Sequence, residues 1–322
     1  MNDKQRKALA LSKVIVLGMI MGGMVLSGGC GKTSLLGNNN SGDEPGVSGA
    51  QNSLNNGNYD GAISASTAVL NTASVASSEK GTASLILGQA ILGKNKVTAI
   101  DLMNSIGDKS SNGPQNVISL LPSSISIGEA MYAAIALNYA ASSLGTAALR
   151  SASQTGGISA KVLSNGDDVI RGVANLMVLA RTIMSYITIS ESNNGNLSNI
   201  SLTGQNSIST YKGALTVFFT PIQATNLPLA LQASASTFNI ATSMTKAYDA
   251  FVDAKLVSGQ LTSITNVKTA INQLQALYNV VKVGGSGTFS YTNSSDASAT
   301  ITTSSDDSDV KEAIMFVLKT VK

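Results

Sequence analysis

The 322-residue chain contains no histidine, no tryptophan and a single cysteine, Cys30. Without histidine, Ser-His-Asp and Cys-His catalytic arrangements and histidine-ligated metal sites are excluded. One cysteine cannot form an intramolecular disulfide or a cysteine metal cluster. A Ser-Lys pair or two carboxylates remain as catalytic arrangements, but serine is so common here that a serine near a lysine carries little information. We therefore expect no enzymatic activity, no cofactor and no metal.

Charged residues are also scarce, at 12% of the chain, which is about half the usual share. Residues 1–29 hold four of the 21 Lys and Arg and one of the 18 Asp and Glu, so the remainder carries 17 of each sign. A neutral body has no basic field for nucleic acid and no acidic field for cationic partners. We expect no nucleic-acid partner.

The N-terminal segment has a basic start, a short apolar run and small residues before the cysteine. Four basic residues lie within residues 1–13, and the apolar run covers residues 14–26. A run of about 13 residues is too short for a membrane-spanning helix, which needs roughly 20, and is typical of a signal peptide. The sequence Leu26-Ser27-Gly28-Gly29-Cys30 resembles the lipobox of bacterial lipoproteins, with Ser27 where leucine is usual.

This resemblance implies a signal peptide over residues 1–29 and a diacylglycerol on the thiol of Cys30. The membrane would then be a partner through this lipid anchor. Gly31, rather than aspartate, follows the cysteine, and by resemblance to other lipoproteins this implies the outer membrane of a bacterial cell envelope as the destination.

The same stretch allows a second interpretation, because Gly28-Gly29-Cys30-Gly31-Lys32-Thr33-Ser34 resembles the phosphate-binding loop of small GTPases. In that loop the glycines turn backbone N–H groups toward phosphates, and the lysine reaches the outer ones. However, Leu26 stands where the first glycine is needed, and the Asn- and Gly-rich residues 37–42 end any helix that follows. The sequence therefore favours export over nucleotide binding.

Residues 31–57 are rich in Asn, Gly and Ser. Such a composition cannot bury enough apolar surface to become ordered, so it predicts a lipidated flexible tether over residues 30–57. Residues 58–322 are predicted to form the helical domain, with a possible subdomain boundary at the polar residues 193–206.

The first predicted helix begins at Asn58, because apolar residues recur at helical spacing from Tyr59 to Ala73. The words Gly57-Asn58-Tyr59-Asp60-Gly61-Ala62-Ile63 resemble the second helix of a tetratricopeptide repeat. Leu87-Gly88 and Ala90 resemble the first helix of that family, and Lys96-Val97-Thr98-Ala99-Ile100 the second. The resemblance covers residues 50–106. The spacing from Ala62 to Ala99 is 37 residues, whereas the family repeats with a period of 34. It implies a helical-repeat array, and an ordinary helical hairpin is the alternative.

Further helices are predicted along the rest of the chain from apolar spacings of three and four. They cover residues 128–150, 169–187, 208–223, 244–252, 264–281 and 310–321. The helix at 128–150 has a second apolar stripe, which predicts neighbours on two sides. Between the last two helices the period changes to two around a polar turn, which predicts a small β-hairpin near residues 287–303. The fold class is therefore mostly all-α, as a helical bundle or a helical-repeat-like array.

Several residues are candidate sites. The acidic cluster Asp306, Asp307, Asp309 and Glu312 lacks the spacing of a calcium loop and is better explained as a solvated helix start, as are Asp167 and Asp168. Met177, Met184 and Tyr186 are predicted core residues. The arginines Arg171 and Arg181 lie on an otherwise apolar helix, where they predict either stems that reach the surface or a buried pair or anion site.

The sequence thus favours a lipid-anchored envelope protein with a helical binding or scaffold module for a protein, peptide or small ligand. The alternative is a solute-binding or transport accessory component that encloses a small apolar ligand between its helices. An exposed groove would favour the first function, and an enclosed apolar cavity of several hundred Å³ the second.

Overall fold

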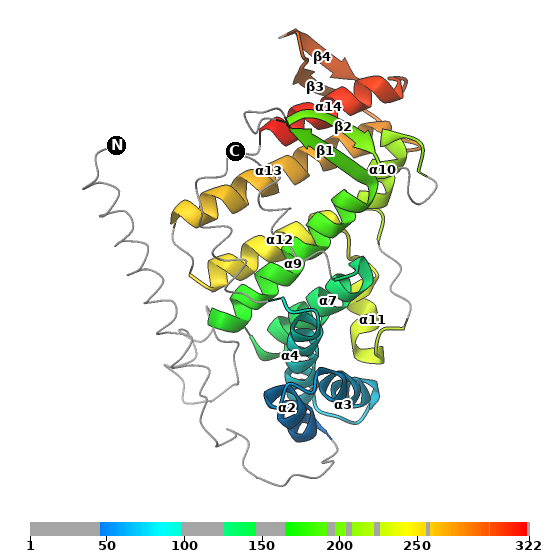
Figure 1. The fold of residues 1–322 in the computed structure, drawn as a ribbon. Helices are drawn as coiled ribbons and strands as arrows, with labels where there is room; N and C mark the ends of the chain where they lie inside the picture. Colours follow the sequence, from blue (N-terminus) through cyan, green and yellow to red (C-terminus); the bar gives the residue numbers. More distant parts are fainter. Residues whose placement is uncertain are drawn as a thin grey trace, which may run out of the picture. The chain divides into compact units, whose positions relative to one another are not determined.

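The structure is a computed structural model that describes residues 46–97, 125–145, 165–191, 197–203, 208–221, 226–255, 258–295 and 297–320. Within these residues it contains ten α-helices and two antiparallel β-hairpins (Figure 1). The predicted mostly α class with a small hairpin near residues 287–303 is confirmed. Cys30 and Lys32 lie outside the described residues.

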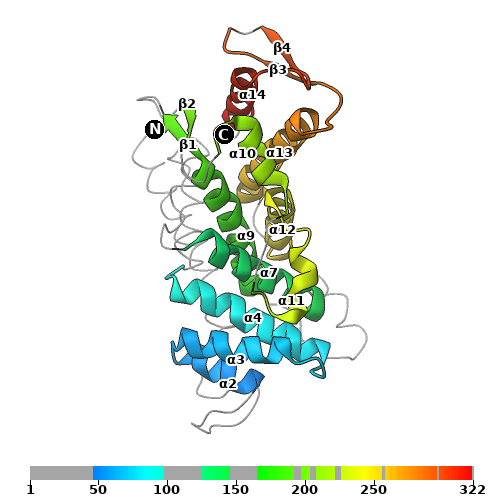
Figure 2. The ribbon, with the colours of Figure 1, turned by 90° about the vertical axis from the view of Figure 1, so that its right-hand side faces the viewer.

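The first three helices, α2 (Val47–Asn55), α3 (Tyr59–Asn71) and α4 (Ser77–Lys94), pack against one another (Figure 2). Helix α2 lies inside the segment that was predicted to be a flexible tether. Its few apolar residues, Val47, Ala50 and Leu54, share one face, and Ala50 is fully buried. The tether prediction is therefore wrong for residues 47–55, because the polar composition concealed a narrow apolar stripe.

Helix α7 (Ile127–Leu144) packs along α4. A capping box starts it, in which the Ser126 hydroxyl accepts a hydrogen bond from the Glu129 backbone N–H at 3.2 Å. The two helices approach closely because a Cβ at Gly88 would lie 2.5 Å from Leu137 Cγ. Since α7 also contacts α9, the prediction of neighbours on two sides is confirmed.

The tetratricopeptide resemblance of residues 50–106 stays a prediction. Helices α3 and α4 form a helical hairpin, as the resemblance implies and as an ordinary hairpin also would. The predicted helix that starts at Lys96 does not begin there, because Lys96 lies in a turn with φ 56°. Residues 98–106 are outside the described part of the chain.

Helix α9 (Asn165–Tyr186) runs through the core and packs against α7, α4 and α12 (Ile240–Asp253) (Figures 1 and 2). Fourteen of its 22 residues are buried. Gly172 lets α12 approach, because a Cβ there would meet the Phe251 ring at 2.6 Å. Two stripes of α9 form the polar sites described below.

A hairpin follows α9 directly. Strand β1 (Ile187–Glu191) pairs with β2 (Leu197–Leu202), with Ile189 opposite Ile200. Its apolar side joins the same core cluster as the helices before and after it. Strand β2 lies within the polar segment 193–206, and its Ser- and Asn-rich outer face hid it from the sequence pattern. The possible subdomain boundary in that segment stays a prediction.

The C-terminal part consists of α12, described above, four further helices and a second hairpin. The helices are α10 (Tyr211–Phe219), α11 (Leu229–Ala235), α13 (Ser258–Val281) and α14 (Asp307–Lys319). The Asp307 carboxylate accepts hydrogen bonds from the backbone N–H groups of Tyr211 at 2.9 Å and Lys212 at 3.1 Å. A residue of the last helix thus caps the N-terminus of α10.

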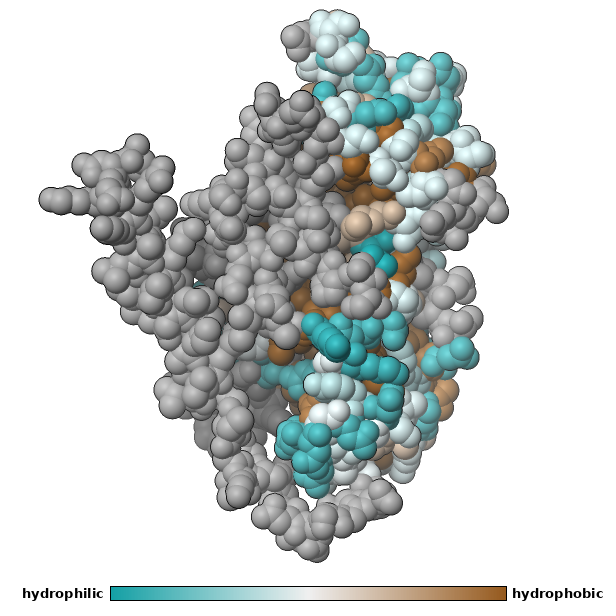
Figure 3. Space-filling model, viewed as in Figure 1, coloured by the Kyte–Doolittle hydropathy of each residue, from teal (hydrophilic) through white to brown (hydrophobic). Residues whose placement is uncertain are grey.

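The second hairpin pairs β3 (Phe289–Thr292) with β4 (Ser298–Ile301). Tyr291 and Ile301 are buried on its inner face, and the Tyr291 ring contacts Phe316 of α14. The outer residues carry hydroxyl groups, and this end of the molecule is coloured white to teal in Figure 3. The alternation predicted from sequence is therefore confirmed.

Candidate functional site

A half-open groove of about 300 Å³ lies among α2, α3, α4 and α9. Its walls are mostly apolar, and they come from segments up to about 120 residues apart in the chain. The lining residues are Leu54, Tyr59, Gln89, Leu92, Gly93, Val97, Ile170 and Val173. We refer to this site as the groove.

Tight packing holds the aromatic wall of the groove in place. The Asn58 side chain accepts a hydrogen bond from the Gly61 N–H at 3.1 Å, which starts α3 at Tyr59. The Tyr59 ring lies against Gly93, where a Cβ would be 2.5 Å from the ring. Beside these two residues, Asp60 and Lys94 form an exposed ion pair at 2.7 Å. The hydrogen bond from Lys94 to Asp60 raises the pKa of the lysine.

One hydrogen bond orients the amide in the groove. Gln89 Nε2 donates to Asp167 Oδ1 at 2.9 Å and joins α4 to the start of α9. An ionised carboxylate only accepts hydrogen bonds, so the NH₂ end of the Gln89 amide must face Asp167. The carbonyl oxygen Oε1 of Gln89 therefore faces away from Asp167.

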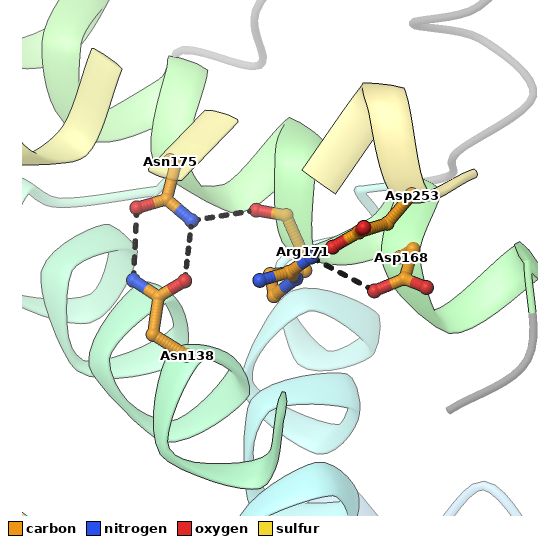
Figure 4. A network of polar contacts seen from close by, with 5 residues as sticks. All are labelled: Asn138, Asp168, Arg171, Asn175 and Asp253. Carbon is orange, nitrogen blue, oxygen red and sulfur yellow. Dashed lines mark hydrogen bonds and ion pairs between the residues drawn. The ribbon is translucent and has the colours of Figure 1, made fainter. Parts of the chain in front are cut away.

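A second polar site lies on another stripe of α9 (Figure 4). Arg171 Nη2 is 3.0 Å from Asp168 Oδ1 and 2.8 Å from Asp253 Oδ2 of α12. The side chains are 5% exposed for Arg171, 0% for Asp168 and 18% for Asp253. A charge at that depth requires an opposite charge beside it, which the two carboxylates supply.

Asparagine pairing continues this network one turn along α9. Asn175 and Asn138 of α7 exchange two amide hydrogen bonds, at 3.0 and 3.1 Å (Figure 4). Asn175 Nδ2 also donates to the Arg171 carbonyl at 2.8 Å, and the Ser243 hydroxyl of α12 donates to the Asn175 carbonyl at 2.7 Å. The network therefore fixes α9 against α7 and α12 and thereby positions Ile170 and Val173 in the groove.

The structure corrects the prediction for Asp168 and decides between the two alternatives for Arg171. Asp168 was predicted to be a solvated helix start, but it is fully buried. Its neighbour Asp167 is partly exposed and points to α4. Arg171 forms the buried pair, whereas Arg181 has no ion pair within the described residues, and its Nε lacks a hydrogen-bond partner there.

The methionine prediction is confirmed in part. Met177 is fully buried in the core, and Tyr186 is partly buried with its ring edge toward Phe218. Met184 is 41% exposed, so its assignment to the core is wrong. Met184 is seven residues, or about two helical turns, after Met177 and lies close to the C-terminal end of α9.

Three acids of the cluster, Asp306, Asp307 and Glu312, cap helices or accept hydrogen bonds from neighbouring elements. The Asp306 carboxylate is the N-cap of α14 and accepts hydrogen bonds from the backbone N–H groups of Ser308 and Asp309. The hydrogen bond from the Asp309 N–H lowers the pKa of Asp306. The Glu312 carboxylate accepts from the Ser294 hydroxyl, which lowers its pKa, and from Tyr291 at 3.3 Å. Across the described residues, no group of three or more acidic, His or Cys side chains is placed to hold a metal ion.

The groove itself was not found from the sequence. Its lining residues are ordinary apolar helix positions, and only Gln89, a polar residue inside an apolar stretch of α4, stands out. Its partner Asp167 is 78 residues away, so no local pattern indicates the pair. The close approaches at Gly88 and Gly93 likewise depend on side chains from other helices.

No family model, curated protein or solved structure matches the chain. None of the helices in the described ranges has the length and apolar character needed to span a membrane.

Proposed function

We propose that the protein is a lipid-anchored binding module of a bacterial envelope, most consistent with the outer membrane, whose groove receives a partner side chain or a small ligand. The half-open groove of about 300 Å³ carries this proposal. Ligand sites are typically concave and mostly apolar, with a few placed polar groups, and the groove has this character. The signal-peptide-like residues 1–29 and Cys30 support the anchoring part.

The groove favours the binding module over a component that encloses its ligand. An open wall allows part of a larger partner to enter, whereas full enclosure suits a free small molecule. The carboxylates that bond to the groove residue Gln89 and to Arg171 also support binding over catalysis. Asp167 accepts from Gln89, and Asp168 and Asp253 are paired with Arg171, so each is already engaged.

The anchoring part is tested by Cys30→Ser after expression in a bacterium. We expect the wild type in the membrane fraction and the variant in the soluble fraction, because the serine cannot receive the thioether-linked lipid. Lys32→Ala is the matched control and should stay with the membrane. If Cys30→Ser still fractionates with membranes and is cut at the same place, the lipid anchor is wrong.

The groove is tested with benzofuran, a neutral bicyclic probe without a hydrogen-bond donor. We expect amide NMR signals of groove residues in the purified full chain to shift on titration. Ile170→Trp should abolish the shifts, because the indole side chain occupies the groove, whereas Asn55→Trp, at an exposed position outside the lining, should retain them. Shifts that persist in Ile170→Trp, or a wild type that shows no shifts with either benzofuran or its N–H analogue indole, would overturn the proposed site.

A further inference from the structure

We infer that the groove selects a neutral, apolar group that carries one N–H or O–H donor at its edge, and that Asp167 sets this selectivity through Gln89. The inference rests on the proposed binding function. It begins with the Gln89 amide, which lines the groove and whose Nε2 donates to Asp167.

The orientation of this amide decides what it offers a ligand. Because Asp167 holds the NH₂ end, the carbonyl oxygen Oε1 is the end left for the groove. No other hydrogen bond to Gln89 occurs within the described part of the chain. An acceptor without a partner in an apolar wall favours a ligand that brings a donor, because desolvating an acceptor without replacing its hydrogen bond costs free energy.

The rest of the lining narrows the ligand class. The Tyr59 hydroxyl both donates and accepts, so it does not discriminate between donors and acceptors. Among the described residues, the groove lining contains no Lys or Arg, and the charge hydrogen-bonded to it is the Asp167 carboxylate. A carboxylate ligand would therefore lack a counter-charge and be repelled, while a neutral donor such as an indole ring, a phenol or a peptide N–H beside an apolar side chain fits.

Indole and benzofuran form the test pair, because they share shape and size and differ in the N–H. We expect the full chain to bind indole about five- to tenfold more tightly than benzofuran, the range that one net hydrogen bond provides. Dissociation constants come from NMR titrations that follow the protein amide signals.

Two variants locate the selectivity. Gln89→Met removes the acceptor while keeping an unbranched side chain, so both probes should bind with equal affinity. Asp167→Asn no longer forces the amide orientation, because asparagine can donate as well as accept, and the preference for indole should fall. Asp60→Asn removes the same charge beside the groove without touching Gln89 and should keep the preference.

The outcomes separate the two proposals. If neither probe binds the wild type, the groove function itself fails. If both bind the wild type equally, or if Gln89→Met keeps the preference for indole, the groove stands and the selectivity inference is overturned. Thermal unfolding followed by circular dichroism checks that each variant is folded.

Discussion

Helix α9 carries two polar sites of opposite character on different stripes. The network of Asp168, Arg171 and Asn175 is almost completely buried, and its members bond to side chains of α7 and α12. On the other stripe, Asp167 accepts a hydrogen bond from the Gln89 amide beside a half-open groove. Depth explains the difference, because a buried charge must be paired within the protein, whereas a site open to water can keep an unused acceptor for a ligand.

Adjacent residues can therefore have unrelated roles. Asp167 and Asp168 are chemically identical, but one helical step of about 100° gives them different partners, Gln89 of α4 for Asp167 and Arg171 of α9 itself for Asp168. The first orients a group that a ligand can contact, and the second holds an internal charge. The predictions below separate the buried network from the groove, in decreasing order of effect on stability.

The largest loss is expected for Arg171→Met. Removing the cation leaves the Asp168 carboxylate buried without its counter-charge, which costs about 3–5 kcal/mol of unfolding free energy. Urea unfolding of the variant and the wild type measures the difference. A loss below about 1 kcal/mol would mean that the network is solvated and that the comparison with the groove is wrong.

Asn138→Leu should cost about 1–3 kcal/mol, because Asn175 remains buried and loses both amide hydrogen bonds from α7. Its other contacts, to the Arg171 carbonyl and Ser243, stay in place. Combining Asn138→Leu with Asn175→Leu in a double-mutant cycle gives the coupling energy. If the two single losses add without coupling, the asparagine pair does not act as a unit.

Gly88→Ala tests the packing that brings α4 close to α7. The new methyl group would lie 2.5 Å from Leu137 Cγ, so we expect a loss of about 1–3 kcal/mol in chemical denaturation. Gly128→Ala is the control, because its Cβ meets nothing within 4 Å, and it should gain up to about 1 kcal/mol from helix propensity. Equal effects of the two substitutions would contradict the close approach.

The same substitution at neighbouring positions compares the two stripes directly. Asp167→Asn should change the unfolding free energy by less than about 1 kcal/mol, because its side chain is partly exposed. Asp168→Asn should cost more, because it removes a buried carboxylate from Arg171. Thermal and urea unfolding of both variants provide the measurement, and a reversed order would refute the assignment of the two acids.

The smallest effect concerns the exposed pair beside the groove. The hydrogen bond to Asp60 raises the pKa of Lys94 above its ordinary value of 10.5. Its contribution is therefore present below that value and is lost as the pH rises through the folded-state pKa. The melting temperature of Lys94→Met should fall less steeply than that of the wild type above pH 10, and a parallel decline would show that the pair contributes nothing.

Periodicity predicted the helices well where apolar residues dominate one face. It placed α7, α9 and α13, and the alternation around residues 293–296 placed the hairpin β3–β4. It failed for α2, whose stripe is hidden in a polar segment, and for β1–β2, whose outer residues are Ser, Thr and Asn. In both cases tertiary burial of a few apolar residues decides the structure, and composition does not show it.

The sites were less predictable than the helices. Arg171 stood out as a charge on an apolar helix, but its partner Asp253 is 82 residues away. The groove requires four helices to converge, so it exists only after the tertiary packing is known. Cys30 stays a prediction that depends on the N-terminal sequence alone.

The cap on α10 has a consequence for how the chain completes its structure. The carboxylate that satisfies the first turn of α10 belongs to Asp307, 96 residues after Tyr211. During synthesis, α10 therefore has two open backbone donors until the last helix has emerged from the ribosome. A chain that stops before Asp307 lacks more than its final helix, because the start of α10 then has only water or an incorrect partner to bind.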